Sequence, residues 1–327
     1  MEIHDNDSGS GHVDFPTSED TVMAILVTGG AGFIGSHMIE RLLSKGKEPI
    51  VCLDNFNDYY DSRLKRSNVS NFINNQQVTI VEDDFCNVGT MQKLFDQHDV
   101  RSVIHLGAYA GVRASVESPH IYQHANVAGT LALLEAARQH RVQRFLLASS
   151  STVYGRGANI PIQEDAPLGI PMSPYGATKR AAELLGLTYF DLHQVPVVCL
   201  RPFSVYGPRL RPDLALTIFV RAIAAGTPIP LYGDGSIQRD FTHVTDICAG
   251  LHAALYADKV VGETINLGHS KPVEMKLLIG MLEAAMHQKA NIEYRPVRPE
   301  DLPVTFADLS KASLLLVYQP QVRLEEG

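Results

Sequence analysis

The sequence predicts an α/β fold in which helices cover both faces of a doubly wound parallel sheet. Two observations carry this prediction. Short β-branched runs alternate with amphipathic stretches from residue 24 onward, and each run is continuously apolar. Continuous apolar strands are typical of a parallel sheet buried on both faces, because half-exposed strands alternate polar and apolar residues. The 327 residues are enough for one large domain or two smaller ones.

The expected strands are six apolar runs: "AILVTGG", "PIVCLDN", "VTIVED", "SVIHLGA", "RFLLASS" and "VPVVCLRPF". Helical patterns lie between them, such as "GSHMIERLLSKG" and "NVAGTLALLEAARQHRV". After about Phe203 the rhythm gives way to the Pro- and Gly-rich pieces "YGPRLRPD" and "GTPIPLYGDGS", which we interpret as loops that build a site. We expect a sheet domain over 24–203 and 240–270 and a smaller α/β domain over 204–239 and 271–327. Residues 1–23, rich in acidic side chains, are expected to form a disordered tail.

Composition narrows the function. The net charge of −8 and the pI near 5.9 disfavour a nucleic-acid partner, because phosphate binding depends on clustered Lys and Arg. No apolar run reaches the roughly 18 residues that a membrane span needs. The four cysteines lie far apart, so we expect reduced core residues of a cytoplasmic protein. His120 and His124 have helical spacing but no third ligand nearby, so no metal site is expected.

The segment "TGGAGFIG" predicts a dinucleotide site. It follows the first strand and spaces Gly29, Gly32 and Gly35 three residues apart at the start of a helix. Glycines allow a tight turn and let backbone N–H groups approach a pyrophosphate. Asp54 ends the second strand about twenty residues later, where a carboxylate accepts hydrogen bonds from an adenosine ribose and repels a 2′-phosphate. The pattern favours NAD over NADP; the alternative is a Gly-rich turn with a surface Asp.

The segment "SPYGATK" predicts a general base. Ser173 fits a helix N-cap and Pro174 the first helical position, which places Tyr175 and Lys179 on one face of the helix. A lysine held beside a tyrosine favours the phenolate, which is a usable base. The alternative is a surface tyrosine and a solvated lysine.

The motifs "TGGAGFIG", "SSSTVYG" and "YGATK" together resemble the extended short-chain dehydrogenase/reductase family, within it the NAD-dependent nucleotide-sugar epimerases and dehydratases. The resemblance runs from residue 24 to the end and includes "HLGA", "ANVAGT", "RDFTHVTD" and "RPEDLPVTFADLSKA". It implies a Rossmann-type NAD-binding domain, a smaller domain that binds a nucleotide sugar, and a homodimer formed through the helices that contain Asn126 and Tyr175.

The resemblance also implies residue roles. Ser150 is the catalytic hydroxyl, Tyr175 the base, and Lys179 its electrostatic partner and a ribose ligand. NAD is expected to be bound by Gly29, Gly32, Phe33, Ile34, Gly35, Asp54, Asn55, Asp84 (the adenine contact), Phe85, Leu106, Ala108, Asn126, Tyr175 and Lys179. The sugar nucleotide is expected to contact Arg113, Ser150, Ser151, Thr152, Ser204, Arg211, Tyr232 (near the base), Arg239 and Arg298 (at the diphosphate) and Asp301.

The segment "SSSTVYG" places a row of hydroxyls, Ser149 to Thr152, after a strand, and we call it the hydroxyl row. The reaction is predicted from the absence of a carboxylate in this row. Dehydratases of this family carry an acid pair just after the catalytic hydroxyl, and UDP-glucuronate decarboxylases carry a Glu near it, whereas this chain has Ser151 and Thr152. Epimerisation at C4 is therefore the predicted outcome. The segments "GPRLRPDLA", "NDYYDSRLKR" and "AGVRAS" resemble those of UDP-glucuronate 4-epimerases, which implies a C6 carboxylate surrounded by Arg211, Ser204, Ser151 and Thr152. A UDP-glucose or UDP-N-acetylglucosamine 4-epimerase, a 4,6-dehydratase and a catalytically silent NAD-binding scaffold are the alternatives.

Overall fold

The computed structural model describes residues 23–298 and 301–327. The acidic tail expected over residues 1–23 lies, apart from Met23, outside this part of the chain. Among the helices of these residues, none combines the length and the apolar character that crossing a membrane requires.

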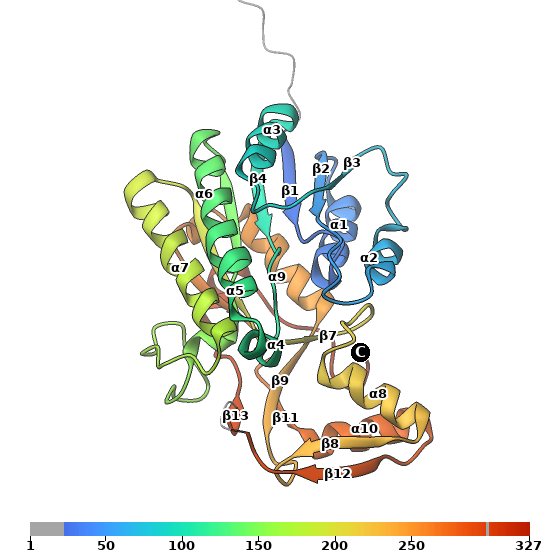
Figure 1. Cartoon of the computed structure of the whole chain (residues 1–327). Helices are drawn as coiled ribbons and strands as arrows, with labels where there is room; N and C mark the ends of the chain where they lie inside the picture. Colours follow the sequence, from blue (N-terminus) through green and yellow to red (C-terminus); the bar gives the residue numbers. More distant parts are fainter. Residues whose placement is uncertain (1–22, 299–300) are drawn as a thin grey trace, which may run out of the picture.

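A seven-stranded, all-parallel sheet forms the centre of the molecule (Figure 1) and confirms the predicted fold class. Its strand order is β10-β6-β5-β4-β1-β2-β3, so the direction of winding reverses between β1 and β4. Every expected apolar run contributes one strand. The strands are β1 (Ala24–Thr28), β2 (Ile50–Asp54), β3 (Val78–Glu82), β4 (Val100–His105), β5 (Arg144–Ala148), β6 (Val197–Pro202) and β10 (Thr264–Leu267).

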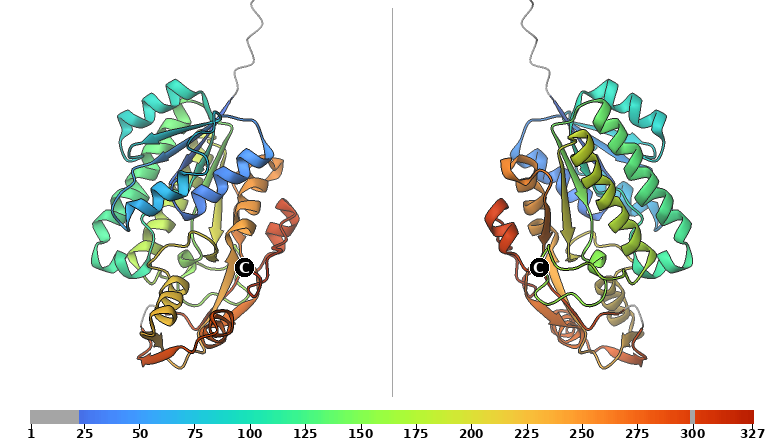
Figure 2. Two further views of the ribbon diagram at one scale, coloured as in Figure 1. Left: turned by 90° about the vertical axis from the view of Figure 1, so that its right-hand side faces the viewer. Right: turned by 90° about the vertical axis from the view of Figure 1, so that its left-hand side faces the viewer.

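Helices cover both faces of this sheet (Figure 2). Alternate side chains of β1 enter two separate apolar clusters: Ile25 and Val27 pack with one layer, Ala24 and Leu26 with the other. The first layer consists of α1 (Phe33–Lys45), α2 (Ser62–Val69), α9 (Val244–Tyr256) and α11 (Ser310–Leu316), and the second of α3 (Val88–His98), α6 (Thr130–Gln139) and α7 (Pro174–His193).

A smaller α/β part lies beyond the carboxyl edge of the large sheet, at the bottom of Figure 1. It contains a four-stranded sheet, a two-stranded parallel sheet and two helices around a third apolar cluster. Fully buried Asp240 accepts the amides of His269, Ser270 and Ala307, which ties the chain's later segments to β9. The elements are β7 (Ser204–Tyr206), β9 (Gln238–His243), β11 (Pro272–Glu274), β13 (Val304–Thr305), β8 (Pro228–Tyr232), β12 (Asn291–Arg295), α8 (Ala215–Ala225) and α10 (Met275–Met286).

One helix differs from its sequence pattern. The stretch "NVAGTLALLEAARQHRV" (126–142) predicts a helix, and the structure forms its first residues as part of a wide π-helical turn, His124–Gly129, that leads into α6. Two short helices, α4 (Val112–Glu117) and α5 (Pro119–Gln123), precede this turn. The turn carries Asn126, whose side-chain amide bonds to the backbone N–H and C=O of Tyr109 at 2.9 Å each. Wide turns inside helices are frequent at functional sites, and this one faces the loop after β4.

Candidate active site

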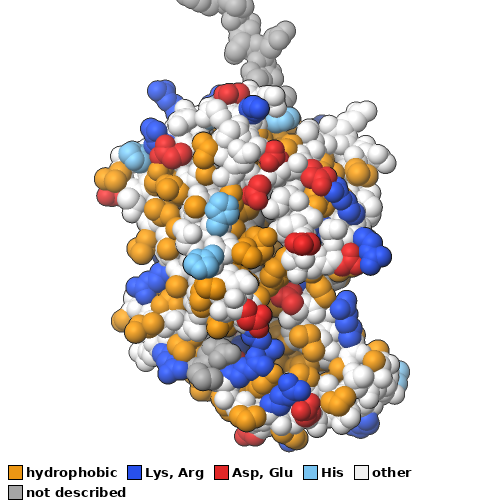
Figure 3. All heavy atoms as spheres, in the orientation of Figure 1, with side chains coloured by type: hydrophobic (Ala, Val, Ile, Leu, Met, Phe, Trp, Pro, Cys, Tyr) orange, Lys and Arg blue, Asp and Glu red, His pale blue; other side chains and the backbone are white. Residues whose placement is uncertain are grey.

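One continuous cavity of about 1070 Å³ runs along the carboxyl edge of the large sheet into the smaller part. Figure 3 shows the hollow between the two parts, with Lys and Arg side chains near its lower end. The cavity lies where the winding reverses between β1 and β4, which is the place where open α/β sheets bind ligands. Its volume suits a dinucleotide together with a second ligand.

The glycine turn at the upper end of the cavity fits a pyrophosphate. Gly29 has φ +66°, and a Cβ there would lie 2.8 Å from the amide nitrogen of Gly107. A Cβ on Gly35 would lie 2.1 Å from the carbonyl oxygen of Gly29. Gly32 caps α1 without a side chain, so the first amides of the helix remain open to an anion. Gly32, Phe33 and Gly35 line the cavity, as does Ile34.

Asp54 lines the cavity at the end of β2, where a ribose ligand is expected. Its carboxylate accepts the amides of Ala31 at 3.2 Å and Phe56 at 2.9 Å. It also forms a buried ion pair with Lys65, at 3.0 Å. Lys65 was not predicted as a site residue from the sequence, although it stands in the quoted segment "NDYYDSRLKR". The pair keeps the carboxylate in place and adds a cation beside the ribose position.

The part of the cavity where the resemblance places the adenine is polar on one side. Asn55 donates to Asp84 at 3.0 Å, and the amide of Cys86 donates to the same carboxylate at 2.8 Å. Burial alone would raise the pKa of Asp84, but these hydrogen bonds lower it below its ordinary value. Phe85, Leu106 and Ala108 complete the wall, as the family resemblance implies. Asn126, by contrast, is fully buried, and its side-chain amide is engaged by Tyr109 and Thr178.

His105 of the "HLGA" motif is buried and links Thr28 of β1 to Thr130 of α6 by hydrogen bonds. Its Nδ1 lies 2.7 Å from the hydroxyl of Thr28, and its Nε2 lies 3.0 Å from the hydroxyl of Thr130. Thr130 already donates to the carbonyl of Asn126, so we assign the proton to Nε2 of His105. Burial, with a smaller contribution from the charge of Lys179, lowers the pKa of His105 to about 3. The imidazole is therefore neutral.

The hydroxyl row follows β5 at the edge of the cavity. Ser150 caps a short 3-10 turn, Ser151–Tyr154, and its oxygen accepts from the amide of Thr152 at 3.2 Å and from the hydroxyl of Thr152 at 3.0 Å. Both lone pairs of Ser150 are thus occupied, which leaves its own hydrogen to donate. The single hydroxyl hydrogen of Thr152 is used inside the protein, so Thr152 can only accept from a ligand in this arrangement.

The predicted base stands opposite this row. α7 begins as the sequence indicates, with Ser173 accepting the amide of Gly176 and Pro174 at the first position. Burial raises the pKa of Tyr175, whereas a hydrogen bond with Ser150 and the positive charge of Arg211 lower it. Both of these groups stabilise the phenolate and offset part of the rise, while the pKa stays above its ordinary value.

Lys179 lies one turn further along α7, fully buried. Its ammonium donates to the carbonyl of Ala148 at 2.7 Å, at the end of β5. Burial lowers the pKa of Lys179 to about 8, and the charge of Glu183 opposes this shift. Glu183 in turn is held by Arg201 through two hydrogen bonds of 2.8 Å. The buried face of α7 therefore carries a row of charges that leads away from Tyr175.

Arginines gather at the lower end of the cavity: Arg113 and Arg239 line it, whereas Arg298 does not line it and packs on Tyr232, which does. The guanidinium of Arg298 stacks on the ring of Tyr232 at 3.7 Å and donates to its hydroxyl, and that of Arg113 lies 5.0 Å from the same ring. Arg239 donates to the carbonyls of Gln238 and Leu302 and lies 3.7 Å from the carboxylate of Asp301. Three cations and an aromatic ring suit a nucleoside diphosphate.

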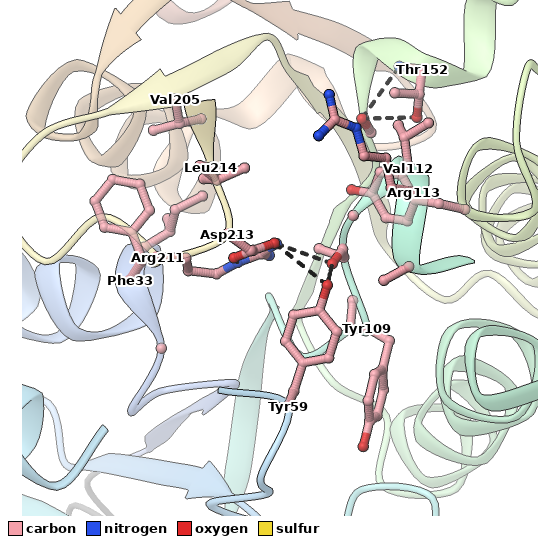
Figure 4. Close-up of a pocket in the computed structure, with 18 of the residues that line it drawn as sticks. Phe33, Tyr59, Tyr109, Val112, Arg113, Thr152, Val205, Arg211, Asp213 and Leu214 are labelled. Atoms are coloured by element: carbon pink, nitrogen blue, oxygen red, sulfur yellow. Dashed lines mark hydrogen bonds and ion pairs between the residues drawn. The ribbon is translucent and has the colours of Figure 1, made fainter. Parts of the chain in front are cut away.

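Arg211 reaches the cavity from the loop after β7 (Figure 4). Its Nε and Nη2 donate to Asp213 at 3.0 and 2.6 Å, and Nη2 also donates to the carbonyl of Ala110 at 3.0 Å. The hydroxyl of Tyr59 donates to the same carbonyl at 2.7 Å. Ser204 and Ser151 line the cavity as well. The sequence indicated Arg211 but not its partners Tyr59 and Asp213, although both stand in segments that carried the resemblance.

Comparison with known proteins agrees with this geometry. The family model described as GDP-mannose 4,6 dehydratase matches residues 26–327. A UDP-glucuronate 4-epimerase of Thermodesulfobacterium geofontis is 41% identical over 304 residues, which are 92% of this chain and 93% of that protein. The chain belongs to the NAD-dependent epimerase/dehydratase family of extended short-chain dehydrogenases/reductases.

Solved structures of this family superpose closely. The UDP-glucuronic acid 4-epimerase of Bacillus cereus, in complex with UDP-glucuronic acid and NAD, gives a TM-score of 0.89 at 37% identity over 93% of this chain and 96% of that one. A dTDP-glucose 4,6-dehydratase of Streptomyces venezuelae with NAD bound gives 0.86 at 28% identity, over 93% and 94%. The protein is thus an enzyme of a nucleotide-sugar epimerase/dehydratase family, and both of these solved relatives contain NAD.

Proposed function

We propose that the protein is a 4-epimerase that interconverts UDP-glucuronic acid and UDP-galacturonic acid. The observation that carries the proposal is the position of Arg211, which is close enough to Tyr175 to lower the pKa of its phenol and lines the cavity with Ser151 and Ser204. A guanidinium beside hydroxyls is a suitable partner for a sugar carboxylate next to the reacting carbon. The relatives named above that act on UDP-glucuronate support the same substrate.

The chain's own residues perform the proton chemistry. The Tyr175 phenolate accepts the proton of the sugar 4-hydroxyl, and Ser150, whose one hydrogen bonds to the oxygen of Tyr175, stabilises that phenolate. Lys179 keeps positive charge at the foot of the same helix face. Bound NAD would supply a hydride acceptor that returns the hydride to the opposite face of the sugar.

The sugar carboxylate can be lost as carbon dioxide during this reaction. Oxidation of C4 in glucuronate produces a β-keto acid, which loses carbon dioxide when the carboxylate carbon–carbon bond aligns with the carbonyl π system. Hydrogen bonds from Arg211, Ser151 and Ser204 would hold the carboxylate away from that alignment. They would also discriminate against a neutral hydroxymethyl group, because a buried guanidinium is left poorly paired without its anion.

A neutral UDP-hexose is the second candidate, and one observation favours it. Asp213 already compensates the charge of Arg211 through two hydrogen bonds. A compensated guanidinium attracts an anion less strongly than a free one. Substrate comparison separates the two candidates directly.

The deciding experiment follows product formation by NMR, with purified protein and UDP-glucuronic acid, UDP-glucose in parallel, and NAD added only in a second series. UDP-galacturonic acid without UDP-pentose supports the proposal. Conversion of UDP-glucose alone contradicts it. With Arg211→Ala, we expect turnover of UDP-glucuronic acid to fall by about 100-fold, since a charge-assisted contact to a buried anion is lost. Turnover of UDP-glucose should fall much less, because it loses only the effect of the Arg211 charge on the Tyr175 phenolate. Equal losses on both sugars would rule out a carboxylate partner for Arg211.

We also propose that the enzyme acts in the cytoplasm as a homodimer. The NAD-binding domain would comprise 24–203 and 240–270, and the nucleotide-sugar domain 204–239 and 271–327. Exposed apolar side chains on α6 and α7, namely Leu131, Leu184 and Leu192, support a covered helix face. Sedimentation of the purified protein tests the dimer.

A further inference from the structure

Tyr59 joins three segments that are far apart in the chain. It lies in the loop between β2 and α2, and its hydroxyl contacts the carbonyl of Ala110 at 2.7 Å, the hydroxyl of Tyr122 at 3.4 Å and the carboxylate of Asp213 at 3.4 Å. Figure 4 shows the tyrosine side chain pointing toward Asp213 and Arg211. Nothing in the catalytic chemistry above uses this residue.

The backbone is shaped to let this hydroxyl approach. Gly111 follows Ala110 with φ +128°, a conformation that side chains rarely adopt. A Cβ on Gly111 would lie 2.7 Å from the hydroxyl oxygen of Tyr59 and 3.7 Å from Nη2 of Arg211. The glycine therefore leaves the space in which Tyr59 and Arg211 meet at one carbonyl.

Arg211 is held along one edge only. Its Nε and Nη2 are bound to Asp213 and Ala110, and its guanidinium lies 5.4 Å from the ring of Tyr59. Nη1 makes no hydrogen bond to any residue within 23–298 and 301–327. The guanidinium side chain is only 16% exposed, so its orientation is set by these few partners. Because the guanidinium is planar and bound along one edge, its remaining nitrogen, Nη1, points in one fixed direction.

We propose that Tyr59 is a positioning residue that, through the carbonyl of Ala110 and through Asp213, fixes Arg211 toward the sugar carboxylate and so sets the preference for an acidic sugar. This inference rests on the proposed function. Tyr59 lies in a loop between two elements of the large-sheet part, β2 and α2, and Arg211 lies in the loop between β7 and α8 of the smaller part. The contact therefore joins the proposed cofactor side of the cavity to its proposed sugar side. Arginine is costly to immobilise, and a preset orientation removes that cost from substrate binding.

The test replaces Tyr59 by Phe in the full-length enzyme with NAD bound. We expect KM for UDP-glucuronic acid to rise about tenfold, the equivalent of one or two lost hydrogen bonds, while kcat changes less than about twofold. KM for UDP-glucose should stay as it is. Tyr60→Phe is the matched control, because the hydroxyl of Tyr60 makes no hydrogen bond to a described residue. In an Arg211→Ala background, Tyr59→Phe should have no further effect on KM.

A second measurement does not depend on the sugar. Hydrogen exchange of the segment 207–214 should be faster in Tyr59→Phe than in the wild type or in Tyr60→Phe. Unchanged exchange overturns the positioning role, as do equal KM effects on both sugars or an additive effect with Arg211→Ala. If the wild type does not act on UDP-glucuronic acid but exchange in Tyr59→Phe is faster, the proposed substrate is wrong, the selectivity role of Tyr59 is rejected, and only its hold on the loop survives.

Discussion

Replacing Glu183 by Gln should lower the melting temperature of the protein by about 5 °C. The carboxylate lies on α7 and its side chain is 3% exposed, while that of Arg201 on β6 is 5% exposed. Two hydrogen bonds of 2.8 Å join them, and the guanidinium also lies 4.6 Å from the ring of Tyr154. The Gln variant leaves Arg201 charged, buried and half paired.

The magnitude follows from the cost of an uncompensated buried charge. Removing one partner of such a pair costs about 3–5 kcal/mol, and Gln keeps one acceptor, so about 3 kcal/mol is expected. The entropy of unfolding is about 2.1 cal/mol/K per residue, or roughly 0.6 kcal/mol/K for the roughly 300 residues that the structure describes. Dividing the first by the second gives a shift of about 5 °C.

Calorimetry with saturating NAD measures this shift in both proteins. Glu293→Gln is the control, because its pair with Arg295 is about half exposed on both sides and should move the melting temperature by less than about 1 °C. A double variant, Glu183→Met with Arg201→Met, should be more stable than either single variant, since no charge is left unpaired. A shift in Glu183→Gln no larger than the control's would refute the reasoning.

Three further predictions concern charge. Burial keeps the pKa of His105 near 3, so below about pH 6.5 the unfolded chain binds a proton at this residue that the folded chain does not bind. The free energy of unfolding should therefore fall between pH 6.5 and 3 by up to about 1.4 kcal/mol per pH unit. In thermal unfolding, His105→Gln should show a smaller dependence of stability on pH. The pKa of Lys179 is about 8, so its ammonium form is lost above that pH and kcat should decline there. Glu183→Gln removes a charge that raises this pKa, so it should move the decline in kcat to lower pH. A pH–rate profile that is the same in Glu183→Gln and the wild type contradicts this role of Lys179. Asp54→Asn leaves Lys65 uncompensated beside the ribose position, so the ratio of NADP to NAD affinity should rise about tenfold, as calorimetric titration would show.

The parts that the sequence predicted correctly are local in the chain. The glycine turn, the cap at Ser173 and the start of α7 each depend on residues within one turn or one helix, so their spacing is sufficient to identify them. The strands were identifiable because burial on both faces leaves a continuous apolar run.

The parts that it did not predict are long-range. Tyr59 and Asp213 are 154 residues apart, and no pattern in either segment shows that their side chains meet. Lys65 lies on a helix after a loop, so its pairing with Asp54 depends on how that loop folds back. Thr152 is a local exception: it was predicted to lie beside a carboxylate, but its only hydrogen is donated to Ser150, two residues earlier, because of the geometry of the 3-10 turn.

The acidic residues of the cavity bear on the choice between epimerisation and elimination. Loss of water from a sugar needs a carboxylic acid beside the leaving hydroxyl. Of the five acidic residues that line the cavity within the described chain, Asp54 is paired with Lys65, Asp84 is bonded to Asn55 and Cys86, Asp213 is bonded to Arg211, Asp301 is paired with Arg239, and Glu117 is exposed at the end of α4. The positions that follow β5 carry hydroxyls, which in the proposed reaction would hold an oxidised sugar without protonating it. The arrangement therefore favours return of the hydride over elimination.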